Sequence, residues 1–325
     1  MAGRSEDGPR QARLAPQIPL TSGMLLLTYV SRMQLPFPHA AMASPAYARY
    51  LPEGARPRWL DSGGFLSLKR GAPPPPAKEL CRLCEELGAE VCFAPDVPPP
   101  PDADSLMYFR MEDENVKAAE AAPCPLAPVV HVHPSSAYDA ALRMAIRAAR
   151  ALGAPLVGVG GAVPHIAVHR YSLVRERALA ALQAAGRAHL FGVGSPTSVK
   201  ALSLPDAIST DWAGWTLKAS YGKVILPPEA DPRGRGGERH VTGRRLHKHY
   251  PVLSGQEAEA LMRWLAARGY PDLPPLEEFV ERLRGSHPYR AQINAFVALR
   301  WYQERRRSYR QRLPPNGGAQ RNRRE

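Results

Sequence analysis

The sequence has no apolar run long enough to cross a membrane. The longest apolar stretch near its beginning is Met24-Leu25-Leu26-Leu27, whereas a membrane-spanning helix needs about 20 apolar residues. The segment before it is polar and charged, and no small-residue cleavage site follows it, so the layout of a secretory signal is also missing. We therefore expect a soluble cytoplasmic protein with no membrane partner.

Cysteine is scarce, with four residues in a chain of 325. So few cysteines in so long a chain do not predict a disulfide framework. Cys81 and Cys84 have the CxxC spacing of a metal or redox site, but Cys84 also falls on an apolar helical stripe with Leu80, Leu83 and Leu87. Because no second CxxC or Cys/His pair follows at finger-like spacing, we favour a structural role over a metal site.

Acidic residues are outnumbered, with 30 Asp and Glu against 43 Lys and Arg, a net charge of +13. Residues 300–325 carry +7 and residues 233–248 carry +5, so two short segments hold +12 of the total. Segregated basic charge is typical of proteins that bind nucleic acid. A solvated basic tail explains residues 312–325 equally well. The candidate contacts to a nucleic-acid backbone are Arg233, Arg235, Arg239, Arg244, Arg245 and Lys248.

Hydrophobic residues make up 44% of the chain, enough for a sizeable core. Eight strand-like runs end in polar or Gly/Pro residues, at 24–31, 58–60, 90–94, 128–133, 155–159, 189–193, 207–209 and 223–226. Helical patterns fill most of the gaps; the clearest is bounded by Ser135 or Ser136 and by Gly153. This alternation predicts an α/β fold, a closed (β/α)₈ TIM barrel, with a doubly wound open sheet as the alternative.

The predicted boundaries follow these patterns. They are a disordered N-terminus over 1–20, the barrel over 21–228, a basic loop over 229–250, a small C-terminal helical module over 251–306 and a disordered basic tail over 307–325. The helix expected between the first two strands, in the proline-rich segment 36–57, is the weakest element.

Candidate site residues stand where the predicted strands end, because barrel active sites form at the carboxyl ends of strands. They are Asp61, Ser62, Asp96, His131, His133, Gly160, Gly161 and Asp211. Taken singly, each has a plain structural explanation as a turn residue, a core histidine or a tight βα turn. Together they predict one mouth lined with acid/base groups, and two carboxylates facing one substrate can perform retaining glycosidic chemistry.

Four stretches occur in a fixed order: "DSGGF", "LVGVGGAVP", "HLFGVGSPTSVKAL" and "DAISTDWAGW". This series resembles the motifs of the tRNA-guanine transglycosylase superfamily, (β/α)₈ enzymes that exchange a guanine base for a 7-deazaguanine without breaking the strand. The resemblance covers residues 24–226. It implies no redox cofactor and no ATP, and a target base flipped out of its stack.

The resemblance also implies roles for individual residues. Asp61 matches the general acid/base, with Ser62 beside it against the base, and Asp96 matches the carboxylate that reads the guanine N1/N2 edge. Asp211 matches the nucleophile, with Asp206 as a weaker candidate. Gly160 and Gly161 match the loop whose amide holds the purine carbonyl. His131 and His133 stand where the family usually has Gln, so their base-reading role is a departure from the pattern.

One departure concerns zinc. Members that act on tRNA usually carry a zinc site of clustered Cys with His after the nucleophile. No cysteine follows Cys124 here, and we interpret His240, His247 and His249 as surface or phosphate-contacting residues. The chain thus looks most like the deazaguanine DNA-modification transglycosylases (the DpdA group). The leading hypothesis is insertion of a preQ0-like base into DNA. Base exchange on tRNA, an inactive nucleic-acid-binding barrel and a sugar-hydrolysing barrel are the alternatives. The sequence leaves open whether the protein forms a homodimer.

Overall fold

The computed structural model describes residues 26–29, 33–241 and 251–312. Its centre is a curled sheet of eight short parallel strands in the order β4-β3-β2-β1-β8-β7-β6-β5. The strands are β1 (Leu26–Tyr29), β2 (Ala41–Ala43), β3 (Arg58–Leu60), β4 (Val91–Cys92), β5 (Val129–His131), β6 (Val157–Gly160), β7 (Ala188–Leu190) and β8 (Ile208–Trp212). Nearly every strand residue is buried, as expected for a parallel sheet covered by helices.

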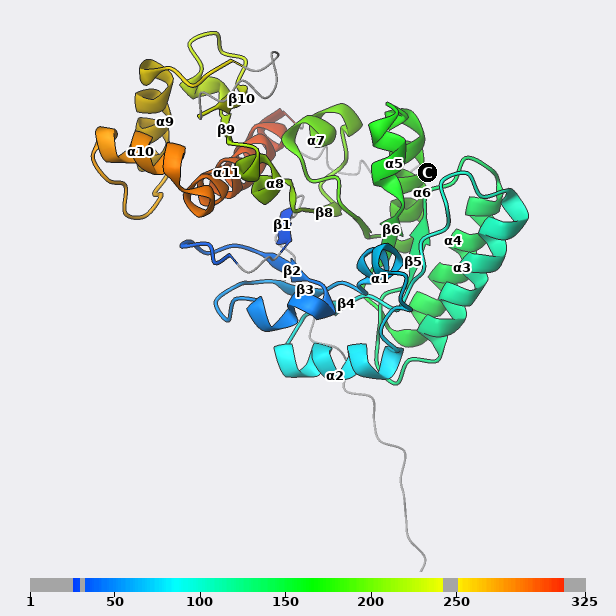
Figure 1. Cartoon of the computed structure of the whole chain (residues 1–325). Helices are drawn as coiled ribbons and strands as arrows, with labels where there is room; N and C mark the ends of the chain where they lie inside the picture. The colour runs from blue at the N-terminus through cyan, green and yellow to red at the C-terminus, as the bar shows by residue number, and fades with distance from the viewer. Residues whose placement is uncertain (1–25, 30–32, 242–250, 313–325) are drawn as a thin grey trace, which may run out of the picture.

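The two outer strands of this sheet, β4 and β5, approach each other just beyond their ends. Phe93 forms a parallel bridge with Ala127. The Ala127 amide donates to the Cys92 carbonyl at 2.7 Å, and the Ala94 amide donates to the Ala127 carbonyl at 2.9 Å. The sheet therefore returns on itself, in a TIM-barrel-like α/β arrangement (Figure 1).

Helices surround the sheet in chain order. They are α1 (Gly64–Arg70), α2 (Ala77–Leu87), α3 (Ser105–Glu120), α4 (Ala137–Leu152), α5 (Ala162–Ala167), α6 (Tyr171–Ala185), α7 (Pro196–Leu202) and α8 (Gly214–Ser220), with a 3₁₀ turn over Pro45–Tyr50. The helix predicted between Ser135 and Gly153 is confirmed as α4. Its first amide, on Ala137, donates to Ser135 Oγ, and Gly153 ends it in the left-handed conformation at φ 68°.

One predicted barrel strand was wrong, and one barrel strand was missed. The second strand of the barrel is β2, in the segment where we expected a helix. Its sequence Ala-Met-Ala has little strand propensity of its own, and pairing with β1 and β3 on either side determines its conformation. The run expected as the eighth strand forms β9 (Lys223–Leu226), which pairs antiparallel with β10 (Gly237–His240) in a separate two-stranded sheet.

The C-terminal helices α9 (Gly255–Ala267), α10 (Leu276–Gly285) and α11 (His287–Arg312) lie beside β9, β10 and α8 (Figure 1). The completely buried Asn294 connects α11 to this region: its side chain accepts from the Ile225 amide at 2.7 Å and donates to the carbonyls of Trp215 and Lys223. Further along α11, the Tyr302 hydroxyl donates to the Gly194 carbonyl at 3.0 Å. None of the helices within the described ranges is both long and apolar enough to span a bilayer.

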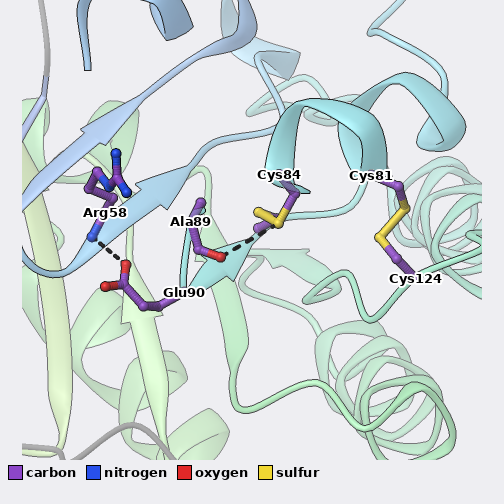
Figure 2. The surroundings of a disulfide bond; sticks show 7 residues. Arg58, Cys81, Cys84, Ala89, Glu90 and Cys124 are labelled. Carbon is purple, nitrogen blue, oxygen red and sulfur yellow. Dashed lines mark hydrogen bonds between the residues drawn. A yellow bond between two sulfur atoms is a disulfide. The ribbon is translucent and has the colours of Figure 1, made fainter. Parts of the chain in front are cut away.

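All four cysteines are paired, which corrects the expectation that no disulfides form. Cys81 is joined to Cys124 and Cys84 to Cys92, with Cα–Cα distances of 5.8 and 6.1 Å (Figure 2). The CxxC spacing puts Cys81 and Cys84 one helical turn apart on α2. One then reaches β4 and the other the segment before β5, a proximity that only the fold creates. The structural role favoured for the CxxC motif is therefore correct, through crosslinks that the sequence did not predict.

Candidate active site

Five of the predicted residues gather at the carboxyl ends of the strands. Asp61 and Ser62 follow β3, Asp96 follows β4, His131 is the last residue of β5, and Asp211 lies near the end of β8. Hydrogen bonds join Ser62 to Asp96 and Asp96 to His131, and the charges of Asp96 and Asp211 both act on Asp61. Because parallel strands end on one side of the barrel, residues far apart in the sequence meet in one mouth.

Asp61 is half-buried and receives a hydrogen bond from Tyr29, whose hydroxyl lies 2.7 Å from Oδ2. Burial and the negative charge of Asp96 raise the pKa of the Asp61 carboxyl to about 7; Asp211 adds to the rise, and the Tyr29 hydrogen bond opposes it. A carboxyl with this pKa gains and loses a proton near neutral pH, which suits a general acid/base.

The loop after Asp61 is shaped by its contact with Asp96. The buried Ser62 donates from Oγ to Asp96 Oδ1 and accepts from the Gly64 amide at 3.1 Å. A Cβ on Gly64 would lie 2.3 Å from the Asp96 carbonyl oxygen, so a larger residue would push the two loops apart. Gly63 has φ 81° and begins α1 in the left-handed region, which favours glycine. Gly64 is thus explained by packing inside the protein, and Gly63 by its backbone conformation.

Asp96 is the first member of a buried row of three titratable groups, Asp96, His131 and Glu112. Its Oδ2 lies 3.0 Å from His131 Nε2, and His131 Nδ1 lies 2.8 Å from Oε1 of Glu112 on α3. Exposed fractions are 6% for Asp96, 3% for His131 and 0% for Glu112. Burial alone lowers the pKa of His131, but the two carboxylates outweigh it and raise that pKa to about 10. The two flanking carboxyl groups thus favour the imidazolium form of His131.

Asp211 is buried and has a different environment. Its Oδ1 accepts from the Gly192 amide at 2.7 Å and lies 3.2 Å from His189 Nε2. His189 is fully buried, its Nδ1 lies 3.0 Å from Ser209 Oγ, and the rings of Trp59, Phe93 and Phe191 surround it. Among the described residues no hydrogen bond reaches Oδ2 of Asp211. The carboxylate is therefore fixed through one oxygen, an arrangement that suits a nucleophile. Asp206 precedes β8 and lies at its opposite end.

His133 does not join His131 as the alternation of a strand predicted. β5 ends at His131, so the alternation stops before His133. The His133 ring stacks on Tyr108 with centroids 4.3 Å apart, and its nitrogens contact Ser135 Oγ and the Ala103 carbonyl. Both nitrogens already have partners, and a base-reading role for His133 has no support from these contacts.

Gly160 ends β6 beside His131. A Cβ on Gly160 would lie 2.6 Å from His131 Cδ2, so this glycine makes room for the imidazole. Gly161 follows with φ 68° and begins α5. Their predicted contact with a purine carbonyl stays a prediction.

The basic residues predicted to hold a nucleic-acid backbone divide into three groups. Arg233 and Arg235 are exposed in the segment before β10. Arg239 is buried and corrects the prediction, because it lies 3.2 Å from Asp231 and donates from Nε to Glu257 at 2.8 Å, so its charge is used internally. Arg244, Arg245 and Lys248 lie outside the described residues, as do His247, His249 and the predicted disordered N-terminus over 1–20. Of the disordered tail predicted over 307–325, residues 307–312 belong to helix α11, and the rest lies outside the described residues.

Three site residues were missed at the sequence level. Tyr29 ends the first strand, and its position could have been included with the other strand ends. Glu112 belongs to the acidic run "MEDEN" on α3, which reads as a solvated face. His189 lies inside β7. The alternation of side chains along a strand predicts that one of them points inward, but it does not identify the residue that this side chain contacts.

The residues present do not fit the zinc site of the tRNA-acting members. No cysteine follows Cys124 in the sequence, and within the described ranges no three His, Cys, Asp or Glu side chains are grouped to hold a metal ion.

No family model matches the chain. It is similar to the tRNA-guanine(15) transglycosylase of Methanopyrus kandleri, with 31% identity over 147 residues. The matched part is 43% of this chain and 31% of that protein, so the chain spans about a third of the length of this curated relative. This partial similarity supports a relationship to the tRNA-guanine transglycosylase superfamily. It does not distinguish one subgroup of the superfamily from another.

Proposed function

We propose that the protein is a guanine transglycosylase that exchanges a guanine base of a nucleic acid for a 7-deazaguanine. The observation that carries the proposal is the pair Asp61 and Asp211, two carboxylates at one barrel mouth with unlike surroundings. Asp61 titrates near neutral pH and Asp211 is fixed by a backbone amide and an imidazole. The partial similarity to a tRNA-guanine transglycosylase adds support from the sequence.

In the first step, an oxygen of Asp211 attacks C1′ of the target nucleotide. The C1′–N9 bond breaks, its electron pair moves to N9, and protonated Asp61 supplies the proton to the departing guanine. The product is a covalent ester between Asp211 and the nucleotide. The strand stays intact, because no phosphodiester bond takes part.

In the second step, the incoming 7-deazaguanine loses its N9 proton to ionised Asp61. Its N9 attacks C1′, the ester bond breaks, and Asp211 leaves as a carboxylate. Two displacements at one carbon restore the original configuration, so the exchange retains stereochemistry. Asp61 ends the cycle protonated, as it began.

We further propose DNA as the polymer, because the cysteines of the tRNA-acting members' zinc element are missing from this sequence. The name of the Methanopyrus kandleri protein favours tRNA as the second candidate. In either polymer the target guanine has to leave its stack to reach a buried carboxylate. The exposed Arg233 and Arg235 are candidates to contact the backbone beside it.

The test is to express the protein with a supply of 7-deazaguanine precursors, digest DNA and tRNA separately, and search both for modified nucleosides by mass spectrometry. We expect a deazaguanine nucleoside in DNA that disappears with Asp211→Ala. Modified tRNA with unmodified DNA would replace the DNA proposal with the tRNA one. Modification of neither polymer would contradict the proposed activity.

A further inference from the structure

The contacts behind Asp96 concern base selection at the proposed site, so this inference rests on the proposed function. Asp96 lies near Asp61, whose pKa its charge raises, and Asp211 acts on Asp61 as well. Three carboxyl groups at one mouth favour protonation of one of them. A cation beside one of these carboxyl groups favours the ionised form of that group.

The two ring nitrogens of His131 both face carboxylate oxygens. Nε2 lies 3.0 Å from Asp96 Oδ2, and Nδ1 lies 2.8 Å from Glu112 Oε1. A neutral imidazole has one N–H, so both contacts are hydrogen bonds to carboxylates only when the ring carries two protons. The His131 backbone amide also donates to Glu112 Oε1 at 3.0 Å, which fixes Glu112 against the strand.

Further contacts hold both the ring and the backbone of His131. Gly160 packs against Cδ2 on one side, and the Tyr108 hydroxyl donates to the His131 carbonyl. The groups that surround Asp96 and His131 therefore come from three elements. They are Glu112 and Tyr108 from α3, Gly160 from β6, and Ser62 and Asp61 from the loop after β3. Tyr29 and Asp211 face Asp61.

We propose that Glu112 and His131 are positioning residues that keep Asp96 an ionised, acceptor-only carboxylate and thereby select a base with adjacent N–H donors. Guanine and 7-deazaguanine present N1–H and the N2 amino group side by side, whereas adenine presents an acceptor at N1. Each carboxylate oxygen has two lone pairs, so Asp96 accepts from Ser62 and His131 and still accepts from a base. A protonated Asp96 would put a donor against the N–H groups of guanine.

The direct test is equilibrium binding of free 7-deazaguanine by calorimetry to wild type and to His131→Gln, across pH 6.5–9. The neutral amide removes the cation beside Asp96. We expect binding at pH 7 to weaken by about tenfold to a hundredfold, the range for a hydrogen bond to a charged group. Raising the pH should recover much of the loss, because high pH favours the ionised form of a carboxyl that has lost its neighbouring cation.

Two further variants distinguish a specific loss of binding from a loss caused by misfolding. Glu112→Gln should weaken binding in the same direction but less, and Glu114→Gln, at an exposed position on the same helix, is the matched control and should bind as wild type. Unchanged binding in His131→Gln, or a loss that is the same at every pH, would overturn the proposal, because an imidazole that only fills space has no pH signature.

A second readout does not depend on base exchange. Nitrogen NMR of histidine-labelled protein, with His131 assigned by its absence in His131→Gln, should report protons on both ring nitrogens at pH 7.5. A neutral ring would overturn the proposal even in an active enzyme. If wild type exchanges no base in either polymer, the proposed function fails, and a doubly protonated His131 still supports its role as the counter-ion of Asp96.

Discussion

Asp61 and Asp211 are the same residue type at the same mouth, yet their surroundings differ. Asp61 accepts from a phenol, and burial together with the negative charge of Asp96 raises its pKa to about 7. Asp211 accepts from a backbone amide and lies beside an imidazole. One carboxyl has a pKa near neutral pH, and the other is held in place by a backbone amide and an imidazole. Pairs whose environments differ in this way divide acid/base and nucleophilic roles.

The largest effect is expected from Asp211→Asn. The amide cannot form the ester with C1′, so product formation should fall by at least about a thousandfold, in the range seen when a nucleophile is removed. Labelled guanine incorporated into the polymer measures the rate, and a denaturing gel measures the covalent adduct, which should disappear. Asp206→Asn is the matched control at the other end of β8; loss of the adduct in that variant instead would identify Asp206 as the nucleophile.

Asp61→Asn should reduce the exchange by about a hundredfold to ten-thousandfold, the contribution typical of a general acid/base. Asp211 can still form the covalent adduct in this variant. A substrate analogue with a better leaving group than guanine should therefore recover much of the rate of the first step. A single-turnover comparison of the two substrates measures this. Equal losses on both substrates would contradict proton donation by Asp61.

Tyr29→Phe sharpens the comparison with a smaller change. The Tyr29 hydrogen bond lowers the pKa of Asp61 against the effect of burial, so its removal should raise that pKa above about 7. The inflection assigned to Asp61 in the pH dependence of single-turnover rates should move to higher pH, while the rate at its optimum changes by less than about tenfold. An unmoved inflection would mean that another group gives rise to it.

The smallest effect concerns stability. The folded pKa of Asp61 is about 7 against an ordinary value of 3.8, so between these values the folded protein holds a proton that the unfolded chain has lost. Stability from this residue is therefore fully present below pH 4 and is lost as pH rises through 7. Asp61→Asn removes the ionisation, and its Tm should exceed that of wild type at pH 8 but not at pH 4. A lower Tm at pH 8 would contradict this sign.

The parallel sheet and α4 could be predicted because each produces a local signal. Short apolar runs ended by Asp or Gly indicate buried strands, and Gly153 ends a helix through its own conformation. β2 has no such signal, since Ala-Met-Ala between prolines becomes a strand only by pairing with two neighbours. β9 has a strong strand pattern, but the pattern does not say which sheet it joins.

The site was predictable at strand ends and not beyond them. Asp61, Asp96 and Asp211 could be collected because parallel topology brings their positions together. Glu112 comes from a helix, and its contact with His131 depends on which face of α3 packs against the barrel. The acidic run in the sequence does not indicate that face. The disulfide partners of Cys81 and Cys84 could not be predicted from the sequence either, because pairing depends on distances in the folded chain.

The hydrogen bond from Tyr302 to the Gly194 carbonyl has a practical consequence. The amide of Gly194 donates to the Asp211 carbonyl at 2.9 Å, so a single residue connects α11 to the strand of the proposed nucleophile. A chain shortened before Tyr302 would lose a brace of the reaction centre together with its basic end. Deletions meant to separate polymer binding from chemistry should therefore begin after this tyrosine.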